Sequence, residues 1–187
     1  MDATSPAHPV TVCPHPLLAG CLATLRDAAT PTPAFRQALQ TAATLLVAET
    51  TRELPTVATT VRTPLAETVM HVPDPSLPIL LAPILRAGLA FCEPALALLP
   101  QAKVYHLGLY RDEATLAPVV YYHRLPKRFE PDGARAFLLD PMLATGGSAI
   151  AAAELLTGLG FPAERLALVC LIAAPEGLAA LHARFPA

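Results

Sequence analysis

The chain of 187 residues contains no tryptophan, and only 15% of its residues are charged. Its formal net charge of −2 gives no bulk attraction to nucleic acid and no polybasic surface for membranes. Prolines or charges interrupt every apolar run before it reaches transmembrane length. The first sixteen residues also lack the basic and apolar regions of a signal peptide. We therefore expect a cytoplasmic protein that binds neither nucleic acid nor membranes.

Cysteine is also scarce, with four residues at positions 13, 21, 92 and 170. No pair has CxxC spacing, and no histidine lies at ligand spacing from one of them. This distribution predicts reduced, mostly buried thiols rather than disulfides or a zinc site. Hydrophobic residues make up 53% of the chain, which excludes a disordered protein. Without repeats or a linker, the sequence predicts a single domain over 1–187.

Apolar segments of strand length alternate with amphipathic segments of helical length. Strands are expected over 78–85, 103–110, 119–125, 134–140 and 165–174. Helices are expected over 16–27, 33–53, 87–99, 146–159 and 175–184, with Thr32 as the N-cap of the second. This alternation predicts an α/β domain with a mainly parallel twisted sheet flanked by helices. A segment rich in threonine and valine over 56–71, broken at Thr63-Pro64, predicts a small β-hairpin arm.

The stretch from Asp140 to Ser148 contains the strongest candidate site. In open α/β sheets, ligands bind outside the carboxyl ends of the strands, and Asp140 ends a buried strand. Gly146 and Gly147 then lead into a helix, whose first N–H groups can bind a phosphate. The carboxylate could accept hydrogen bonds from sugar hydroxyls or help to hold a divalent cation. The pattern favours a ribose 5-phosphate site, although Asp140 could instead cap a turn and the glycines merely start a helix.

The segment DPMLATGGS (140–148) resembles the 5-phosphoribosyl-1-pyrophosphate (PRPP) signature of type I phosphoribosyltransferases, and specifically of the uracil phosphoribosyltransferase family. Further blocks in the same order resemble that family: HPLL (15–18), PILRAGL (83–89), LGLYRDEATLAPVVYYHRLP (107–126) and AAPEGLAAL (173–181). The resemblance implies the type I fold. It also implies transfer of a phosphoribosyl group from PRPP to uracil, giving UMP and pyrophosphate in pyrimidine salvage.

The resemblance assigns roles residue by residue. It implies Asp140 and Arg111 as catalytic residues and Mg²⁺, carried by PRPP, as the cofactor; no metal ligand of the protein itself is assigned. The implied PRPP ligands are Arg86, Arg111, Asp140, Pro141, Met142, Leu143, Ala144, Thr145, Gly146, Gly147 and Ser148. The segment 112–118 matches the mobile loop that covers the site in this family. A homodimer and a possible GTP effector are further implications.

One family feature is missing. Family members carry a further strand and a glycine-rich uracil-binding segment, of the type PGLGDAGDR, after the block at 173–181. No uracil-binding residue is found in this chain, so we expect it to be truncated at its C-terminus. Three explanations stay open at this point: a truncated enzyme, with or without activity; a non-catalytic PRPP-binding sensor or regulator; or an enzyme whose base contacts come from a partner subunit.

Overall fold

The computed structural model describes residues 10–111, 118–127 and 133–186. Its main sheet has the order β6-β5-β3-β7-β9, and the short β4 also pairs with β3. The strands are β3 (Ile79–Leu85), β4 (Lys103–Val104), β5 (Leu107–Arg111), β6 (Pro118–His123), β7 (Arg135–Leu139) and β9 (Leu166–Val169). All neighbouring pairs are parallel except β5 and β6, which are antiparallel. The predicted mainly parallel α/β architecture is confirmed.

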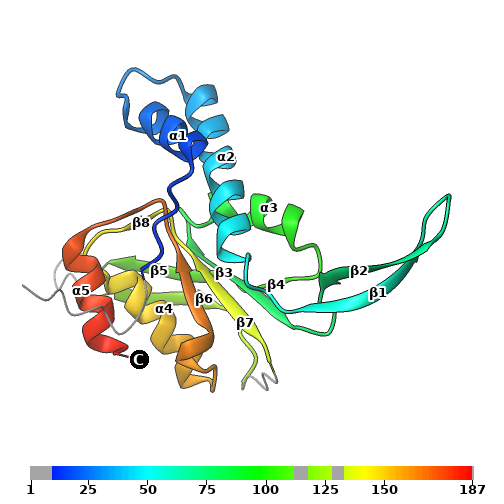
Figure 1. Cartoon of the computed structure of the whole chain (residues 1–187). Coiled ribbons are helices and arrows are strands. Elements are labelled where there is room, and N and C mark those ends of the chain that lie inside the picture. The colour runs from blue at the N-terminus through cyan, green and yellow to red at the C-terminus, as the bar shows by residue number, and fades with distance from the viewer. Residues whose placement is uncertain (1–9, 112–117, 128–132, 187) are drawn as a thin grey trace, which may run out of the picture.

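Helices cover both faces of this sheet (Figure 1). One side is covered by α2 (Thr32–Thr50) and α3 (Leu89–Leu98), with α1 (Pro16–Arg26) packed on α2. The other side is covered by α4 (Gly147–Gly158), which α5 (Pro175–Arg184) contacts. Two layers of helices leave the central strands buried on both faces, which explains why they read as continuous apolar runs.

The strand β3 contributes side chains to the apolar clusters on both faces of the sheet. Leu80, Ala82 and Ile84 lie in the apolar cluster beneath α4, whereas Leu81 lies in the cluster beneath α2 and α3. Successive side chains of a strand point to opposite faces, so a strand buried on both faces needs apolar residues throughout. All four of these residues are buried. Packing on both faces of the sheet therefore fixes the position of the carboxyl end of β3.

The predicted hairpin arm is confirmed as β1 (Thr56–Arg62) and β2 (Glu67–Pro73), which pair antiparallel in continuous register. Thr63 closes the turn, because its hydroxyl accepts a hydrogen bond from the Ala66 N–H and donates one to the Ala66 carbonyl. The arm stands away from the body of the domain (Figure 1), and most of its residues are exposed. A two-stranded ribbon is marginally stable alone in water, so contact with another surface would stabilise the arm.

Some sequence-based expectations were wrong in detail. The expected strand 165–174 is divided into β9 and β10 (Ile172–Ala173), and β10 leaves the main sheet to pair with β8 (Met142–Leu143). The expected strand 103–110 is likewise divided into β4 and β5. Thr32 is not the N-cap of α2, because the carbonyl of Pro31 already accepts the N–H of Phe35.

The thiols are free, as predicted, but only Cys92 is buried, and the other three are half-buried. No helix in the described part of the chain is both long and apolar enough to cross a bilayer.

Candidate phosphate-binding site

The site is built where β3 and β7 end side by side. These strands are parallel neighbours, and Pro83 is paired with Leu139. Their carboxyl ends therefore meet at one edge of the sheet, where ligands of open α/β folds bind. This edge brings the turn that follows β3, with Arg86, next to Asp140 at the end of β7.

The turn after β3 rests directly on the end of β7. The Gly88 N–H donates to the Ile84 carbonyl over 2.8 Å, and the preceding Leu85–Arg86 peptide bond is cis. A Cβ on Gly88 would lie 2.2 Å from the Leu139 carbonyl oxygen. Arg86 is exposed on the outer side of the turn, while Gly88 is buried. Only glycine lets the two backbones approach this closely, and that contact fixes the base of the loop carrying Arg86.

We expect Gly88→Ala to destabilise the protein by about 1–3 kcal/mol, because the new methyl group overlaps backbone atoms that cannot move aside. Urea denaturation measures the change in the free energy of unfolding. Gly20→Ala is the matched control, since a Cβ on Gly20 meets nothing within 4 Å. Alanine there is favoured in a helix, so this control should leave stability unchanged or slightly higher. Equal stability of both variants would contradict the close packing.

Asp140 is half-buried, and its backbone N–H donates to the Val169 carbonyl. Burial raises the pKa of its carboxyl group to about 6, although a hydrogen bond from the Met142 N–H acts in the opposite direction. The carboxylate is poorly compensated by the protein, so hydroxyl donors of a bound sugar would stabilise its charged form. This environment suits a carboxylate that binds a ribose diol.

The loop from Pro141 to Gly146 leads to the N-terminus of α4. Gly146 has φ +86° and serves as the N-cap, and its carbonyl accepts the first helical hydrogen bond, from Ile150. The amides of the first turn of a helix have no partner within the helix and carry partial positive charge. Ala144 and Thr145 are exposed, so the loop opens to solvent. It has the geometry of an anion-binding turn with a carboxylate at its start.

The structure brings most of the predicted ligands together. Residues 140–148 are consecutive and run through β8 into the first turn of α4, and Arg86 lies at the same sheet edge. Arg111 is the last residue of β5, the other neighbour of β3 in the sheet. Leu143 is buried, so it offers backbone groups rather than its side chain. The predicted covering loop, 112–118, lies outside the described residues except for Pro118, the first residue of β6.

Three residues beside the site were not singled out by the sequence. Gly88 and Gly177 pack against the backbones of Leu139 and Ala144, respectively. Cys170 follows β9, and both burial and the charge of Asp140 raise the pKa of its thiol. Gly88 and Gly177 lie within the blocks that resemble the family, but their contacts join segments more than thirty residues apart. A local pattern therefore gave no signal for these roles.

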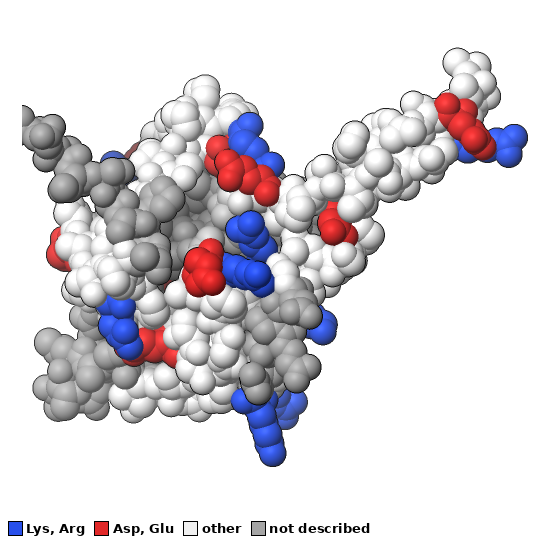
Figure 2. Space-filling view, turned by 60° about the horizontal axis from the view of Figure 1, so that its bottom comes forward, with Lys and Arg blue, Asp and Glu red and all other residues white. Residues whose placement is uncertain are grey.

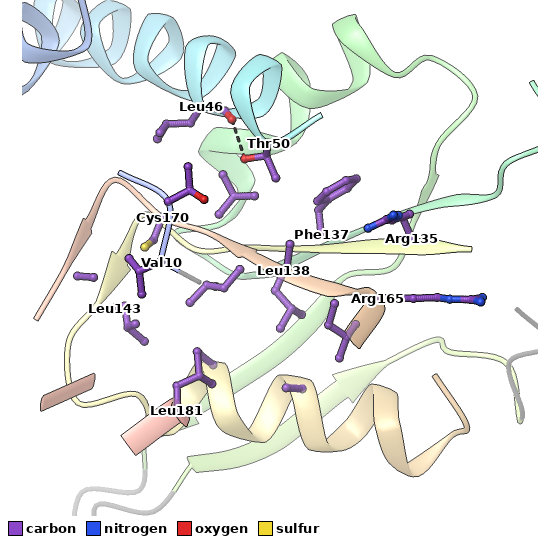
Figure 3. A pocket seen from close by; sticks show the side chains of 18 of the residues that line it. Val10, Leu46, Thr50, Arg135, Phe137, Leu138, Leu143, Arg165, Cys170 and Leu181 are labelled. Carbon is purple, nitrogen blue, oxygen red and sulfur yellow. Dashed lines mark hydrogen bonds between the residues drawn. The ribbon is translucent and has the colours of Figure 1, made fainter. Parts of the chain in front are cut away.

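A cavity lies behind this loop, along the outer edge of β9 (Figure 3). Its volume is about 530 Å³. Arg135 and Arg165 lie at one end and Leu143 and Cys170 at the other, with Thr50 of α2 above, donating a hydrogen bond to the Leu46 carbonyl. The cavity shares only the buried side of Leu143 with the phosphate loop.

Charge is sparse and mixed in sign on the face shown in Figure 2, where lysine and arginine side chains lie among aspartate and glutamate. No group of three or more histidine, cysteine, aspartate or glutamate side chains in the described residues is arranged to hold a metal ion.

The architecture is that of the type I phosphoribosyltransferases. A purine phosphoribosyltransferase from Pyrococcus horikoshii superimposes with a TM-score of 0.51 at 16% identity, covering 74% of each chain, which establishes the fold alone. The AQ2163 protein from Aquifex aeolicus is closer, with a TM-score of 0.82 and 35% identity over 94% of this chain and 81% of that one.

The particular family follows from the sequence comparisons. The family model described as uracil phosphoribosyltransferase matches residues 12–187. The chloroplastic uracil phosphoribosyltransferase of Arabidopsis thaliana is 46% identical over 95% of this chain, and that of Synechocystis sp. is likewise 46% identical over 95%. The chain spans 60% of the Arabidopsis protein and 82% of the Synechocystis protein. The chain belongs to the uracil phosphoribosyltransferase family.

Proposed function

We propose that this protein transfers the phosphoribosyl group of PRPP to uracil, giving UMP and pyrophosphate. The observation that carries the proposal is the half-buried Asp140 at the start of a loop whose glycine N-cap, Gly146, opens α4. A carboxylate for the ribose diol and helix amides for the 5-phosphate match the two ends of a phosphorylated pentose. Membership of the uracil phosphoribosyltransferase family supports uracil as the acceptor and phosphoribosyl transfer as the reaction.

In the proposed reaction, a bond forms between uracil N1 and ribose C1 as the bond from C1 to the pyrophosphate oxygen breaks. Pyrophosphate leaves with the electron pair, and the N1 proton passes to solvent. Asp140 holds the diol, the loop 141–148 holds the phosphate, and Arg86 and Arg111 bind pyrophosphate as its charge develops. Catalysis then comes from positioning and electrostatic stabilisation, without a nucleophilic side chain.

Mg²⁺ is proposed to arrive with PRPP, as the family resemblance implies. Its oxygen-rich preferences fit a substrate that offers pyrophosphate and ribose oxygens, with Asp140 as the nearby acid of the loop. When bound, Mg²⁺ would neutralise charge on the leaving pyrophosphate.

The family resemblance also supports three broader proposals: a homodimer, a GTP effector and a cytoplasmic location. The exposed β1–β2 arm is the structural feature that favours a dimer, because a second subunit would cover it. No residue of this chain is assigned to GTP or to uracil.

Calorimetry with PRPP and Mg²⁺, followed by a UMP-formation assay with uracil, tests the proposed function. We expect saturable PRPP binding and uracil-dependent release of pyrophosphate. Binding without turnover would leave PRPP recognition in place and overturn catalysis by this chain. Absence of PRPP binding in a folded protein would overturn the whole proposal.

A further inference from the structure

The phosphate loop is held from behind by the segment that joins β9 to α5. The Asp140 N–H donates a hydrogen bond to the Val169 carbonyl, and the Leu171 N–H donates one to the Pro141 carbonyl over 2.9 Å. The Ala174 N–H then donates to the Leu143 carbonyl over 2.8 Å, and β8 pairs with β10. A segment about thirty residues further along the chain thus follows the loop residue by residue.

This attachment ends at a contact that requires glycine. Gly177 lies in the first turn of α5, and a Cβ there would be 2.3 Å from the Ala144 carbonyl oxygen and 3.1 Å from Leu143 Cγ. In the opposite direction, a Cβ on Gly146 would be 3.0 Å from the Gly177 carbonyl oxygen. The nearest atoms on both sides belong to backbone, so no side chain can rotate away to make room.

We propose that Gly177 is a positioning residue for PRPP. Because it has no side chain, α5 can pack directly against the backbone of residues 144–146. This packing fixes the position of that backbone and the direction of the N–H groups at the start of α4. The proposal rests on the proposed function of that loop. Anion recognition by backbone amides depends on fractions of an ångström, so a displaced loop loses affinity without losing its fold. Gly177 itself is buried beneath the loop, so in this proposal it acts through the loop backbone.

The first test compares Gly177→Ala with Gly158→Ala by calorimetry with PRPP and Mg²⁺. Both substitutions replace a helical glycine with alanine, but a Cβ on Gly158 meets nothing within 4 Å. We expect the Kd for PRPP to rise at least about tenfold in Gly177→Ala and to stay unchanged in Gly158→Ala. Equal Kd values in the two folded variants would overturn the proposal.

A second pair of variants keeps the test valid if Gly177→Ala does not fold. The Ala180 methyl lies 3.4 Å from the position that a Cβ of Gly146 would occupy, whereas the neighbouring Ala179 is exposed. Ala180→Val should push on the loop, and Ala179→Val imposes the same cost on the helix without that contact. We expect Ala180→Val to raise the KM for PRPP with little change in kcat. A fall in kcat alone, as from a smaller folded fraction, would count against positioning.

Hydrogen exchange separates failure of this inference from failure of the proposed function. If the unsubstituted protein does not bind PRPP, the proposed function fails, but the mechanical role of Gly177 is still testable without ligand. Amide exchange over 141–150 should then be faster in Gly177→Ala than in Gly158→Ala, with the rest of the chain unchanged. Identical exchange over 141–150 in both variants would overturn the role of Gly177.

Discussion

Asp140→Asn is expected to lower PRPP-dependent UMP formation by about 100-fold or more, as removal of one preorganised charged partner does at other sites. The neutral amide cannot match the carboxylate as an acceptor for two ribose hydroxyls. Steady-state kinetics and PRPP calorimetry measure the loss. Unchanged affinity for PRPP would remove Asp140 from the site.

The same substitution should raise stability while it removes function. Because burial raises the pKa of the Asp140 carboxyl group in the folded protein to about 6, above its ordinary value of 3.8, the folded protein binds the proton more tightly than the unfolded chain does. Ionisation of this carboxyl group therefore lowers the free energy of unfolding as pH rises from about 4 to about 6. At neutral pH, Asp140→Asn should raise the free energy of unfolding by about 1–2 kcal/mol, after allowance for solvent screening. Urea denaturation at pH 5 and pH 7.5 should show the larger gain at pH 7.5.

Asp74 provides a contrast of opposite sign. Hydrogen bonds from the Ser76 hydroxyl and N–H lower the pKa of the Asp74 carboxyl. Its ionised form therefore stabilises the folded state at neutral pH, and this contribution is lost as pH falls through the lowered pKa. Asp74→Asn should lower stability slightly and leave PRPP binding intact. If Asp140→Asn also lowered stability at neutral pH, burial of that carboxylate would not be the dominant effect.

Affinity for PRPP should itself depend on Asp140. As pH falls below about 6, protonation of this carboxyl removes the acceptor, so the Kd for PRPP should rise. The part of this rise caused by Asp140 should be absent in the asparagine variant. Calorimetry across pH 5 to 8 compares the two proteins.

Gly146→Val is expected to abolish measurable PRPP binding, with a Kd raised by about 100-fold or more. The N-cap of α4 has φ +86°, a conformation that costs a β-branched residue about 1–3 kcal/mol. The new side chain would also press on the Gly177 carbonyl oxygen, 3.0 Å from the added Cβ. Both effects should move the amides at the start of α4 that we propose to bind the phosphate.

Gly160→Val is the control for backbone strain. Gly160 has φ +94° just after the C-terminal end of the same helix, so valine there meets a similar conformational cost. We expect comparable losses in the free energy of unfolding but normal PRPP affinity for Gly160→Val. If both variants lost PRPP binding equally, the effect of Gly146 would be general instability rather than loop geometry.

Local patterns in the sequence determined much of this protein. Continuous apolar runs marked β3 and β7, because strands covered on both faces need apolar residues at every position. The Thr63-Pro64 break marked the hairpin arm. Asp140 followed by Gly146 and Gly147 marked the loop that we propose to bind phosphate, since all of these residues lie within nine positions. Each of these signals is complete within a short stretch of chain.

Only the tertiary structure decided how the stretches meet. It placed β7 beside β3, set Gly88 against Leu139 and Gly177 against Ala144, and moved β10 out of the main sheet to hold the loop. It also assigned the positive φ to Gly146, where the sequence offered two adjacent glycines. The raised pKa of Asp140 has the same origin. Burial and backbone contact are properties of segments far apart in the chain, so no local pattern contains them.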